Sequence, residues 1–276
     1  MKRTRYDVNI VTPVYGSPSF LDSMLNSLLS VDAGDIKWSI TLVDDAYAGP
    51  DREKVDLVYT KYSRDNRIKV LRSRENSGFA ASNNKGFSNG SAPLLLLLNS
   101  DILIKEPGWL ERMAQEFDDS DVGISGARLL FFEEDHPNFT KDPGRPAGKT
   151  QHAGVAFNVM GQPYHIFMGW DSDHINVMQR REMNAVTGAC LMIRRTDYFR
   201  VGGLDTDYKI GNFEDVQICL QIRALDKKVL YNPSVCLYHF AGGSNNTATA
   251  KFNETLFKLK CANLIEHDDY RYGRYD

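Results

Sequence analysis

The sequence predicts an α/β protein whose first hundred residues form a Rossmann-like half built on a parallel sheet. Two observations carry this prediction. Segments with strand and helix patterns alternate from residue 8 to residue 98. The segment 94–98 is leucine at every position, which is typical of a strand that helices cover on both faces. A buried strand that ends an alternating series indicates a parallel sheet between two layers of helices.

The first half divides into strands and helices at regular intervals. Each strand is a short β-branched or apolar run, and the helices show apolar residues at helical spacing. Ser77-Gly78 opens the third helix and forms its loop and N-cap. The expected strands are 8–11, 38–43, 68–71 and 94–98, and the expected helices are 20–29, 55–62 and 79–87.

The second half of the chain has a less regular pattern. Residues 132–152 contain several prolines and glycines and no periodicity, so we expect a long loop there. The charged, tyrosine-rich end at 270–275 is compatible with a docked, a dimerising or a mobile tail. The expected strands are 186–193, 229–231 and 235–238, the last two on either side of a turn at Asn232-Pro233, and the expected helices are 215–225 and 251–261.

The composition of the 276 residues is that of an ordinary globular protein, with 42% hydrophobic and 25% charged residues. The net charge of −3 gives no basic footprint, so no nucleic-acid partner is expected. Apolar runs are far shorter than the roughly 20 residues that cross a bilayer. The four cysteines show no CxxC spacing and are expected to be reduced and mostly buried. These features favour a cytoplasmic enzyme or binding protein.

Polar residues follow the predicted strands at the points where the strands end. In an open α/β sheet, ligands bind beyond the carboxyl ends of the strands. Each cluster alone could cap a turn or a helix, but stability does not require all of them at one crevice. The clusters are Thr12-Pro13-Val14-Tyr15, Asp44-Asp45, Asn76-Ser77-Gly78 and Asn99-Ser100-Asp101.

These clusters suit the binding of a nucleotide together with a metal ion. A carboxylate can accept a hydrogen bond from the edge of a base, and Mg²⁺ or Mn²⁺ takes oxygen ligands from carboxylates and phosphates. The sequence contains neither a P-loop nor a GxGxxG motif, so nucleotide hydrolysis and dinucleotide redox chemistry are poorly supported. A metal-bridged diphosphate without a P-loop indicates nucleotide-sugar chemistry.

A series of motifs in fixed order carries a resemblance to a known family. The motifs are VTPVY (11–15), VDD (43–45), NSGFAASNNKG (76–86), LNSD (98–101), QHAGV (151–155), AVTGAC (185–190), GGLD (202–205), FEDV (213–216) and YH (238–239). The chain resembles family 2 glycosyltransferases with the GT-A fold. It is most similar to the subgroup that builds bacterial cell-surface polysaccharides and includes rhamnosyltransferase-like members.

The resemblance implies a domain organisation. One GT-A domain would occupy residues 1–245 and would join a Rossmann-like nucleotide-binding half to an acceptor half with a mixed sheet. The nucleotide-binding half would end at about residue 104, and the acceptor half would follow at about 105–245. Residues 246–276 would form a C-terminal helix and tail.

The resemblance also implies which residues hold the donor, a UDP- or dTDP-linked sugar. Either Asp44 or Asp45 would contact the base, and the resemblance does not decide between them. Gly78 would let the backbone approach the diphosphate closely. The donor-binding residues would be Thr12, Pro13, Tyr15, Asp44, Asp45, Asn76, Gly78, Asn83, Asn99 and Ser100.

A divalent cofactor, Mn²⁺ or Mg²⁺, would be bound by Asp101. The motif begins with Asn99 where a true DxD motif has an acid, so a ligand from elsewhere is expected. The resemblance implies that this ligand is His239. Without the resemblance, a lone histidine on a strand is more often structural than metal-binding.

The catalytic candidates are Asp215 and Glu214, at the start of a predicted helix. Acids in a first helical turn often only complement the helix dipole, and this alternative remains open for Glu214. In the resembling family, the acid at the position of Asp215 deprotonates the acceptor hydroxyl, and a single displacement inverts the sugar. Gln217 stands where the family often has a further Asp. Two further expectations are that residues 186–190 form the floor beneath the sugar and that the loop 132–152 closes over the donor.

The expected acceptor is a hydroxyl of a glycan or a lipid-linked glycan. A lipid-linked acceptor would be met by peripheral contact at the inner face of the membrane. Two alternatives remain: a nucleotide-sugar or glycan-binding protein without catalysis, and a nucleotidyltransferase. The first would lack Asp101 or Asp215, and both are present; the second would need a glycine-rich, basic loop, whereas residues 12–16 hold one glycine and no lysine.

Overall fold

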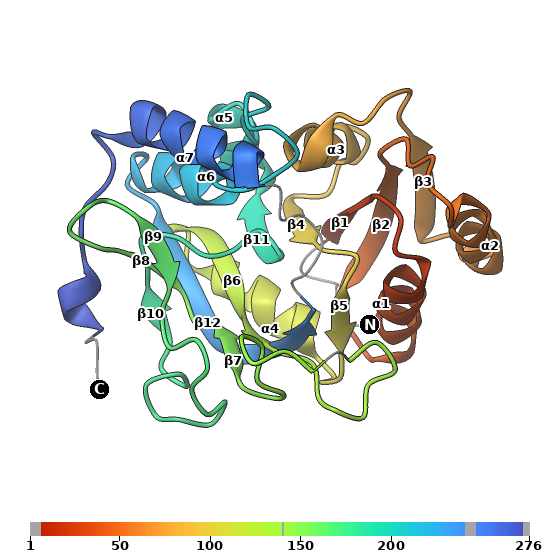
Figure 1. Cartoon of the computed structure of the whole chain (residues 1–276), viewed down its shortest axis with the longest axis horizontal. Helices are drawn as coiled ribbons and strands as arrows, with labels where there is room; N and C mark the ends of the chain where they lie inside the picture. Colours follow the sequence, from red (N-terminus) through yellow and green to blue (C-terminus); the bar gives the residue numbers. More distant parts are fainter. Residues whose placement is uncertain (1–6, 140, 241–246, 273–276) are drawn as a thin grey trace.

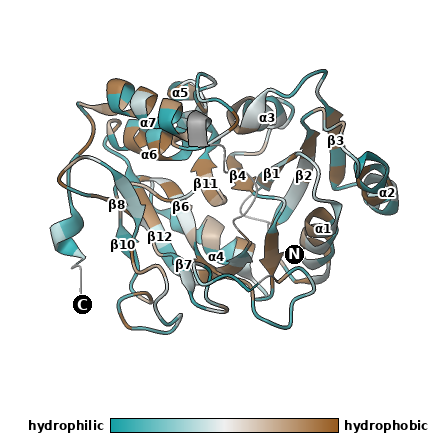
Figure 2. Cartoon of the chain, in the orientation of Figure 1, coloured by the Kyte–Doolittle hydropathy of each residue, from teal (hydrophilic) through white to brown (hydrophobic). Residues whose placement is uncertain are grey.

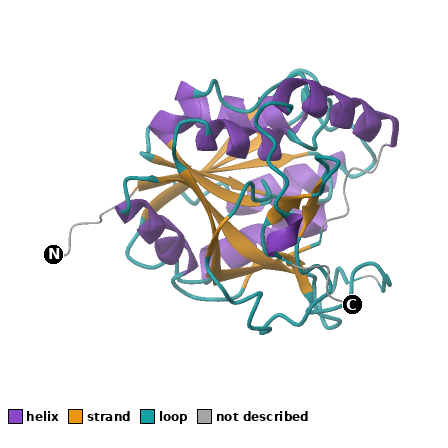
Figure 3. Ribbon diagram, turned by 90° about the vertical axis from the view of Figure 1, so that its left-hand side faces the viewer, coloured by secondary structure: helices purple, strands orange, loops and turns teal. Residues whose placement is uncertain are grey.

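A mixed sheet of ten strands runs through the protein, with helices on both of its faces (Figures 1 and 3). The computed structural model describes residues 7–139, 141–240 and 247–272. The strand order along the main path is β10-β12-β6-β11-β4-β1-β2-β3, with β5 paired to β12 and β7 paired to β6. A separate ribbon consists of β8 and β9.

The N-terminal half is the parallel α/β unit that the sequence predicts. Strand β1 pairs in parallel with β2 and with β4, and β2 pairs in parallel with β3. The strands are β1 (Asp7–Val14), β2 (Lys37–Asp44), β3 (Ile68–Arg72) and β4 (Leu94–Leu98), and the helices are α1 (Pro18–Ser30), α2 (Arg52–Tyr62) and α3 (Gly78–Ser88).

The sheet becomes mixed where the second half begins. Strand β11 lies antiparallel between β4 and β6, and β12 is parallel to β6. The remaining strands are β5 (Ile102–Ile104), β6 (Val122–Leu130), β7 (Thr150–His152), β8 (Val155–Phe157), β9 (Pro163–His165), β10 (Arg181–Glu182), β11 (Cys190–Arg194) and β12 (Lys228–His239). The helices are α4 (Trp109–Gln115), η1 (Glu116–Asp118), α5 (Arg195–Arg200), α6 (Glu214–Arg223), α7 (Thr247–Cys261) and η2 (Asp269–Arg271).

The five leucines of β4 show why this strand is apolar throughout. Leu94, Leu96 and Leu98 pack into one buried cluster, with residues of α1, α2 and α4. Leu95 and Leu97 pack into the other, with residues of α3, α6 and α7. Figure 2 shows β4 and β11 in apolar colours in the middle of the sheet. Within the parts of the chain that the structure describes, no helix has both the length and the apolar character of a membrane span.

Two strand predictions are corrected. The predicted strand 186–193 begins only at Cys190, because Thr187 and Gly188 donate their N–H groups to side chains rather than to a neighbouring strand. The predicted strands 229–231 and 235–238 are one strand, β12, without a turn between them. Asn232 Oδ1 accepts the backbone N–H of Ser234 at 3.0 Å, and the extra residues form a shift in register against β6. The strand therefore accommodates Pro233 as a β-bulge.

In the described residues 132–139 and 141–149, the predicted loop 132–152 is irregular, and its last residues form β7. The C-terminal segment is docked over the residues described: α7 buries Phe257 and Cys261, and Asp268 accepts the N–H of Phe157 at 2.8 Å. Helix α7 begins at Thr247, earlier than predicted. The expected boundary near residue 245 and the tail positions 273–275 lie outside the described residues.

Close packing of α3 against β1 generates a stability prediction. A Cβ atom on Gly86 would lie 2.4 Å from Cγ1 and 2.7 Å from Cγ2 of the buried Val11. We expect Gly86→Ala to lower the free energy of unfolding by about 1–3 kcal/mol through overpacking, although alanine favours a helix by about 1 kcal/mol. Urea denaturation measures the effect.

The matched control is the double variant Gly86→Ala/Val11→Ala, which removes both clashing methyl groups. Its loss of stability should be smaller than the sum of the two single losses. A Gly86→Ala variant as stable as the wild type would contradict the close approach.

Candidate functional site

The predicted polar clusters meet at one edge of the sheet. The pairing of Val14 with Asp44 places the ends of β1 and β2 side by side. Strand β4 pairs with β1 on its other side and ends before Asn99. The polar residues that follow these strands therefore lie at neighbouring strand ends, as the crevice rule requires.

Asp45 connects the end of β2 to the start of α3. Its carboxylate accepts the N–H of Ser77 at 2.9 Å, the hydroxyl of Ser77 at 2.9 Å and the N–H of Gly78 at 2.8 Å. Asn76 Oδ1 accepts the same Gly78 N–H at 3.1 Å. The Asp45 side chain is buried, and its hydrogen-bonding capacity is largely used by this loop. We therefore assign Asp45 an architectural role at the site.

Asp44 is arranged differently. Its Oδ2 pairs with Arg52 Nη1 at 2.6 Å. Its Oδ1 is buried and has no hydrogen-bond partner among the residues that the structure describes. A buried carboxylate oxygen without a partner is rare in folded proteins and requires an explanation. The structure thus separates two acids that the sequence could not distinguish.

The other residues predicted to bind the nucleotide sugar differ in their exposure. Thr12 and Asn83 are buried, and Oγ1 of Thr12 and Oδ1 of Asn83 also lack a partner within the described chain. Asn83 Nδ2 donates to the carbonyl of Phe79 at 2.9 Å. Tyr15 is exposed and meets Tyr47 edge-on, with ring centroids 5.3 Å apart. Pro13, Asn99 and Ser100 are half-buried.

Asp101 and His239 come together across 138 positions of sequence because β5 pairs with the end of β12, with Ile102 opposite His239. Oδ1 of Asp101 lies 3.2 Å from Nε2 of His239. Nδ2 of Asn99 lies 3.3 Å from the same nitrogen. The two predicted metal ligands are therefore in contact with each other, and Asn99 lies beside them.

Gln151 determines which ring nitrogen of His239 carries the proton. Its Oε1 lies 2.7 Å from Nδ1, and its Nε2 donates to the His239 carbonyl at 3.0 Å. Since Oε1 is an acceptor, Nδ1 carries a hydrogen, and Nε2 is the ring nitrogen that faces Asp101 and Asn99. Atoms 3.2 Å apart can serve as neighbouring ligands of one cation, with Gln151 as the outer partner that orients the histidine.

The donor set fits Mn²⁺ or Mg²⁺ bound jointly with substrate. Among the residues in the described ranges, no three His, Cys, Asp or Glu side chains are grouped closely enough to hold a metal ion on their own. Magnesium-like ions in proteins are commonly held by one or two protein ligands plus phosphate oxygens. Gln151 was not among the predicted site residues, although it begins the QHAGV motif.

The two acids at the start of α6 differ in environment. Glu214 is buried, and its Oε2 has no partner among the described residues. Burial, together with the nearby Asp215 carboxylate, raises the pKa of Glu214 from 4.5 to about 8. Asp215 is half-buried; its Oδ2 accepts the N–H of Gly188 at 2.7 Å, and its Oδ1 accepts the N–H of Val216 at 2.9 Å. The geometry favours Asp215 as the base, because a protonated Glu214 cannot accept a proton.

Two histidines in contact with each other lie beside the segment that precedes β11. Thr187 donates its N–H to Nε2 of His152 at 3.4 Å, and Nδ1 of His152 lies 3.2 Å from Nδ1 of His165. Burial lowers the pKa of both histidines below the ordinary value. They are therefore neutral at pH 7 and lie beside the segment that orients Asp215. The sequence offered no signal for His165 beyond its residue type.

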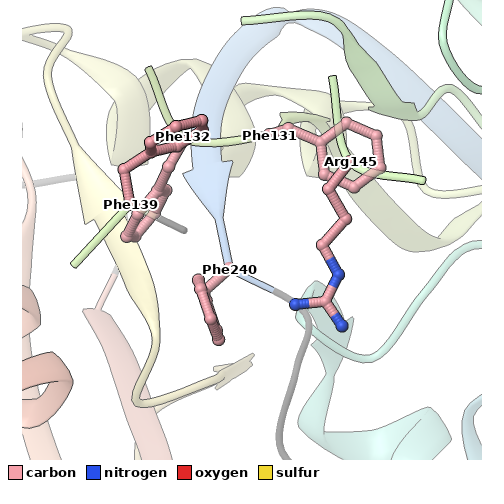
Figure 4. A pocket seen from close by; sticks show the side chains of 5 residues that line it. All are labelled: Phe131, Phe132, Phe139, Arg145 and Phe240. Atoms are coloured by element: carbon pink, nitrogen blue, oxygen red, sulfur yellow. The ribbon is translucent and has the colours of Figure 1, made fainter. Parts of the chain in front are cut away.

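An aromatic pocket adjoins the Asp101–His239 pair. Phe240 follows His239 and donates its N–H to the carbonyl of Asp101 at 3.2 Å. The guanidinium of Arg145 lies over the Phe240 ring, 5.2 Å from its centroid. Figure 4 shows the rings of Phe132, Phe139 and Phe240 around this pocket. The loop predicted to close over the donor thus supplies aromatic side chains next to the candidate metal site.

Comparison with known proteins identifies relatives of the sequence and of the fold. The family model described as glycosyl transferase family 2 matches residues 9–198. The O-antigen biosynthesis protein RfbC of Myxococcus xanthus is 26% identical over 242 residues, which is 86% of this chain and 17% of RfbC. The chain spans less than a fifth of the length of the first curated relatives that it matches.

Two solved structures share the GT-A fold. GalNAc-T7 with UDP, GalNAc and Mn²⁺ superposes with a TM-score of 0.65 at 16% identity, over 85% of this chain and 44% of that one. The mannosyltransferase PcManGT of Pyrobaculum calidifontis, in complex with GDP-Man and Mn²⁺, superposes with a TM-score of 0.64 at 14% identity. The match covers 96% of this chain and 67% of that one. At these identities the similarity establishes the predicted fold class.

The pKa of Glu214 generates a pH prediction. Because the folded state binds this proton more tightly than the unfolded state, the stabilisation is complete below about pH 4.5 and is lost as the pH rises through about 8. Glu214→Gln cannot titrate. We expect the melting temperature of the wild type to fall relative to that of Glu214→Gln between pH 5 and pH 8.

Thermal unfolding of both proteins at the two pH values measures this difference. The variant Glu254→Gln is the control, since Glu254 is half-buried and its pKa is lowered by Lys258 rather than raised. A difference between wild type and Glu214→Gln that is the same at pH 5 and pH 8 would show that Glu214 is not a protonated, buried acid.

Proposed function

Because this chain belongs to glycosyl transferase family 2, we propose that it is a metal-dependent inverting enzyme acting on a UDP- or dTDP-linked sugar. The acceptor would be a hydroxyl group of a glycan or a lipid-linked glycan. The observation that carries the proposal is the contact of Asp101 Oδ1 with His239 Nε2 at 3.2 Å beside the strand ends. These two atoms could bind one cation as neighbouring ligands, and oxygens of a diphosphate would complete its coordination.

The donor is proposed to lie along the ends of β1 and β2. Oδ1 of Asp44 would accept a hydrogen bond from the N–H of the base, which uracil and thymine share. Thr12 and Asn83, which also have oxygens without partners, would border the nucleoside and the diphosphate. The UDP of GalNAc-T7 and the GDP-Man of PcManGT support a nucleotide-sugar donor, and the name of RfbC supports a cell-surface polysaccharide as the acceptor class.

Asp101 and His239 would hold the divalent cation, with Asn99 beside them and Gln151 orienting the histidine. Bound there, a Mn²⁺ or Mg²⁺ ion would neutralise negative charge on the departing diphosphate. The Mn²⁺ present in both solved relatives supports this role.

Asp215 is proposed to take the proton of the acceptor hydroxyl. The N–H groups of Gly188 and Val216 hold its carboxylate in one orientation, so it can meet an acceptor placed against residues 186–190. The acceptor oxygen bonds to the anomeric carbon from the face opposite the diphosphate, and the bond to the diphosphate breaks with its electron pair. One displacement inverts the configuration without a covalent sugar–enzyme intermediate. Glu214, kept neutral by burial, adds no second negative charge beside the base.

The two halves of the chain are proposed to have different functions. The nucleotide half, about residues 1–104, would bind the donor, and the acceptor half, about 105–245, would present the base. The loop 132–152 would cover the donor, and the floor would be residues 186–190. A lipid-linked acceptor would reach the site by peripheral contact with the inner face of a membrane.

Thermal shift with a panel of nucleotide sugars and Mn²⁺ tests the proposal, because a ligand that binds the folded state raises its melting temperature. UDP or dTDP compounds should stabilise the wild type, and Asp44→Asn should lose most of that response while Glu53→Gln, an exposed acid on α2, keeps it. The absence of any response to UDP and dTDP compounds would overturn the proposed function.

Substitution of the proposed base separates binding from chemistry. We expect Asp215→Asn to reduce the release of nucleoside diphosphate by about 10²–10⁴-fold, the usual contribution of a positioned base. The donor-induced thermal shift should remain. Steady-state kinetics with the donor found in the panel measures the effect; a variant with wild-type turnover would remove Asp215 from the mechanism, and a lost thermal shift would assign it to donor binding.

A further inference from the structure

The loop that leads into α6 follows an unusual backbone path. Ile210, Asn212 and Phe213 have positive φ angles of 65°, 92° and 75°, although none of them is glycine. A left-handed conformation is costly for a β-branched or aromatic residue and persists only where the surroundings hold it. This loop, residues 209–213, immediately precedes Glu214 and Asp215.

The side chain of Asn253, on α7, forms hydrogen bonds with backbone groups of this loop. Its side chain is fully buried. Oδ1 accepts the N–H of Lys209 at 3.0 Å, and Nδ2 donates to the carbonyls of Lys209 at 3.0 Å and Gly211 at 2.8 Å. Both hydrogens of the amide and its oxygen are therefore used by the loop. Figure 1 shows α7 lying beside α6, so the clamp comes from the helix that covers the start of the catalytic segment.

The far side of the same loop rests on α3. The carbonyl of Ile210 accepts the N–H of Phe79 at 2.7 Å. The backbone of Ile210 is also so close to Gly78 that a Cβ there would lie 3.1 Å from it. Asp45 holds Gly78 independently from β2. The loop thus contacts α7 through Lys209 and Gly211 and contacts the start of α3 through Ile210.

From this geometry we propose that Asn253 is a positioning residue for Asp215. By fixing the strained loop 209–213, its amide sets where α6 begins and so directs the Asp215 carboxylate toward the N–H of Gly188. This role rests on the proposed function of Asp215 as the base. Under this proposal, α7, which lies beyond the matched region 9–198, contributes to catalysis as well as to the hydrophobic core.

The purely structural alternative is that Asn253 serves folding alone. Under that alternative, loss of the amide would lower stability and would affect turnover only as any equally destabilising substitution does. Leu28→Ala provides the comparison, since Leu28 is fully buried on α1 in the cluster on the other face of the sheet. Glu254→Gln, at the half-buried residue next to Asn253 on α7, is the local control.

The test compares Asn253→Ala and Asn253→Asp with these controls in the full-length chain. The aspartate keeps the acceptor for Lys209 N–H but turns an oxygen toward two carbonyls, so it should not rescue. We expect kcat for nucleoside diphosphate release to fall about ten- to a hundredfold in both Asn253 variants. KM for the donor should stay within about threefold, because Asp45 still holds the donor-side loop.

Hydrogen exchange supplies a readout that does not depend on activity. The Lys209 amide should exchange faster in Asn253→Ala than in the wild type, and Leu28→Ala should leave it protected at the temperature where its overall stability matches. Unchanged kcat in Asn253→Ala, or an equal loss of kcat in Leu28→Ala, would overturn the positioning role. A wild type that releases no nucleoside diphosphate from any UDP or dTDP sugar would instead contradict the proposed function, and the exchange result would still decide whether Asn253 holds the loop.

Discussion

The carboxylate of Asp45 ties the end of β2 to the start of α3, and the candidate site is arranged around this contact. Three hydrogen bonds to Ser77 and Gly78 fix the first turn of a helix that packs closely on β1 through Gly86. With Asp45 committed, Asp44 is left with one buried oxygen free of protein partners in the described chain. The start of α3 also contacts the loop that leads to Asp215. The groups proposed to bind the donor and the group proposed to act on the acceptor therefore depend on the same helix start.

The site combines groups whose chemistry is determined by their surroundings. Gln151 orients His239 so that Nε2 faces Asp101, which suits the binding of a cation. Burial keeps Glu214 protonated at neutral pH, while two backbone N–H groups orient the adjacent Asp215. The environments of these adjacent acids thus differ, because one carboxyl is removed from water beside a negative charge and the other is held by backbone N–H groups.

Much of this arrangement could be predicted from the sequence, because strand ends and helix starts are local patterns. The buried strand 94–98, the acids after β2 and the pairing of Asp101 with His239 follow from periodicity, the crevice rule and family motifs. What could not be predicted depends on tertiary contacts. Whether Asp44 or Asp45 is engaged depends on a loop 32 residues away, the bulge in β12 depends on its partner β6, and the role of Asn253 depends on backbone angles that no motif encodes.

The central claim is that Asp101 and His239 together hold a divalent cation with the nucleotide diphosphate. Isothermal titration of Mn²⁺, with and without UDP or dTDP, tests it most directly. The wild type should bind Mn²⁺ more tightly when the nucleotide is present, and Asp101→Ala and His239→Ala should each weaken that binding by about tenfold or more, while Glu53→Gln, at an exposed acid on α2, should not. Mn²⁺ binding that is unchanged by both substitutions would contradict the account.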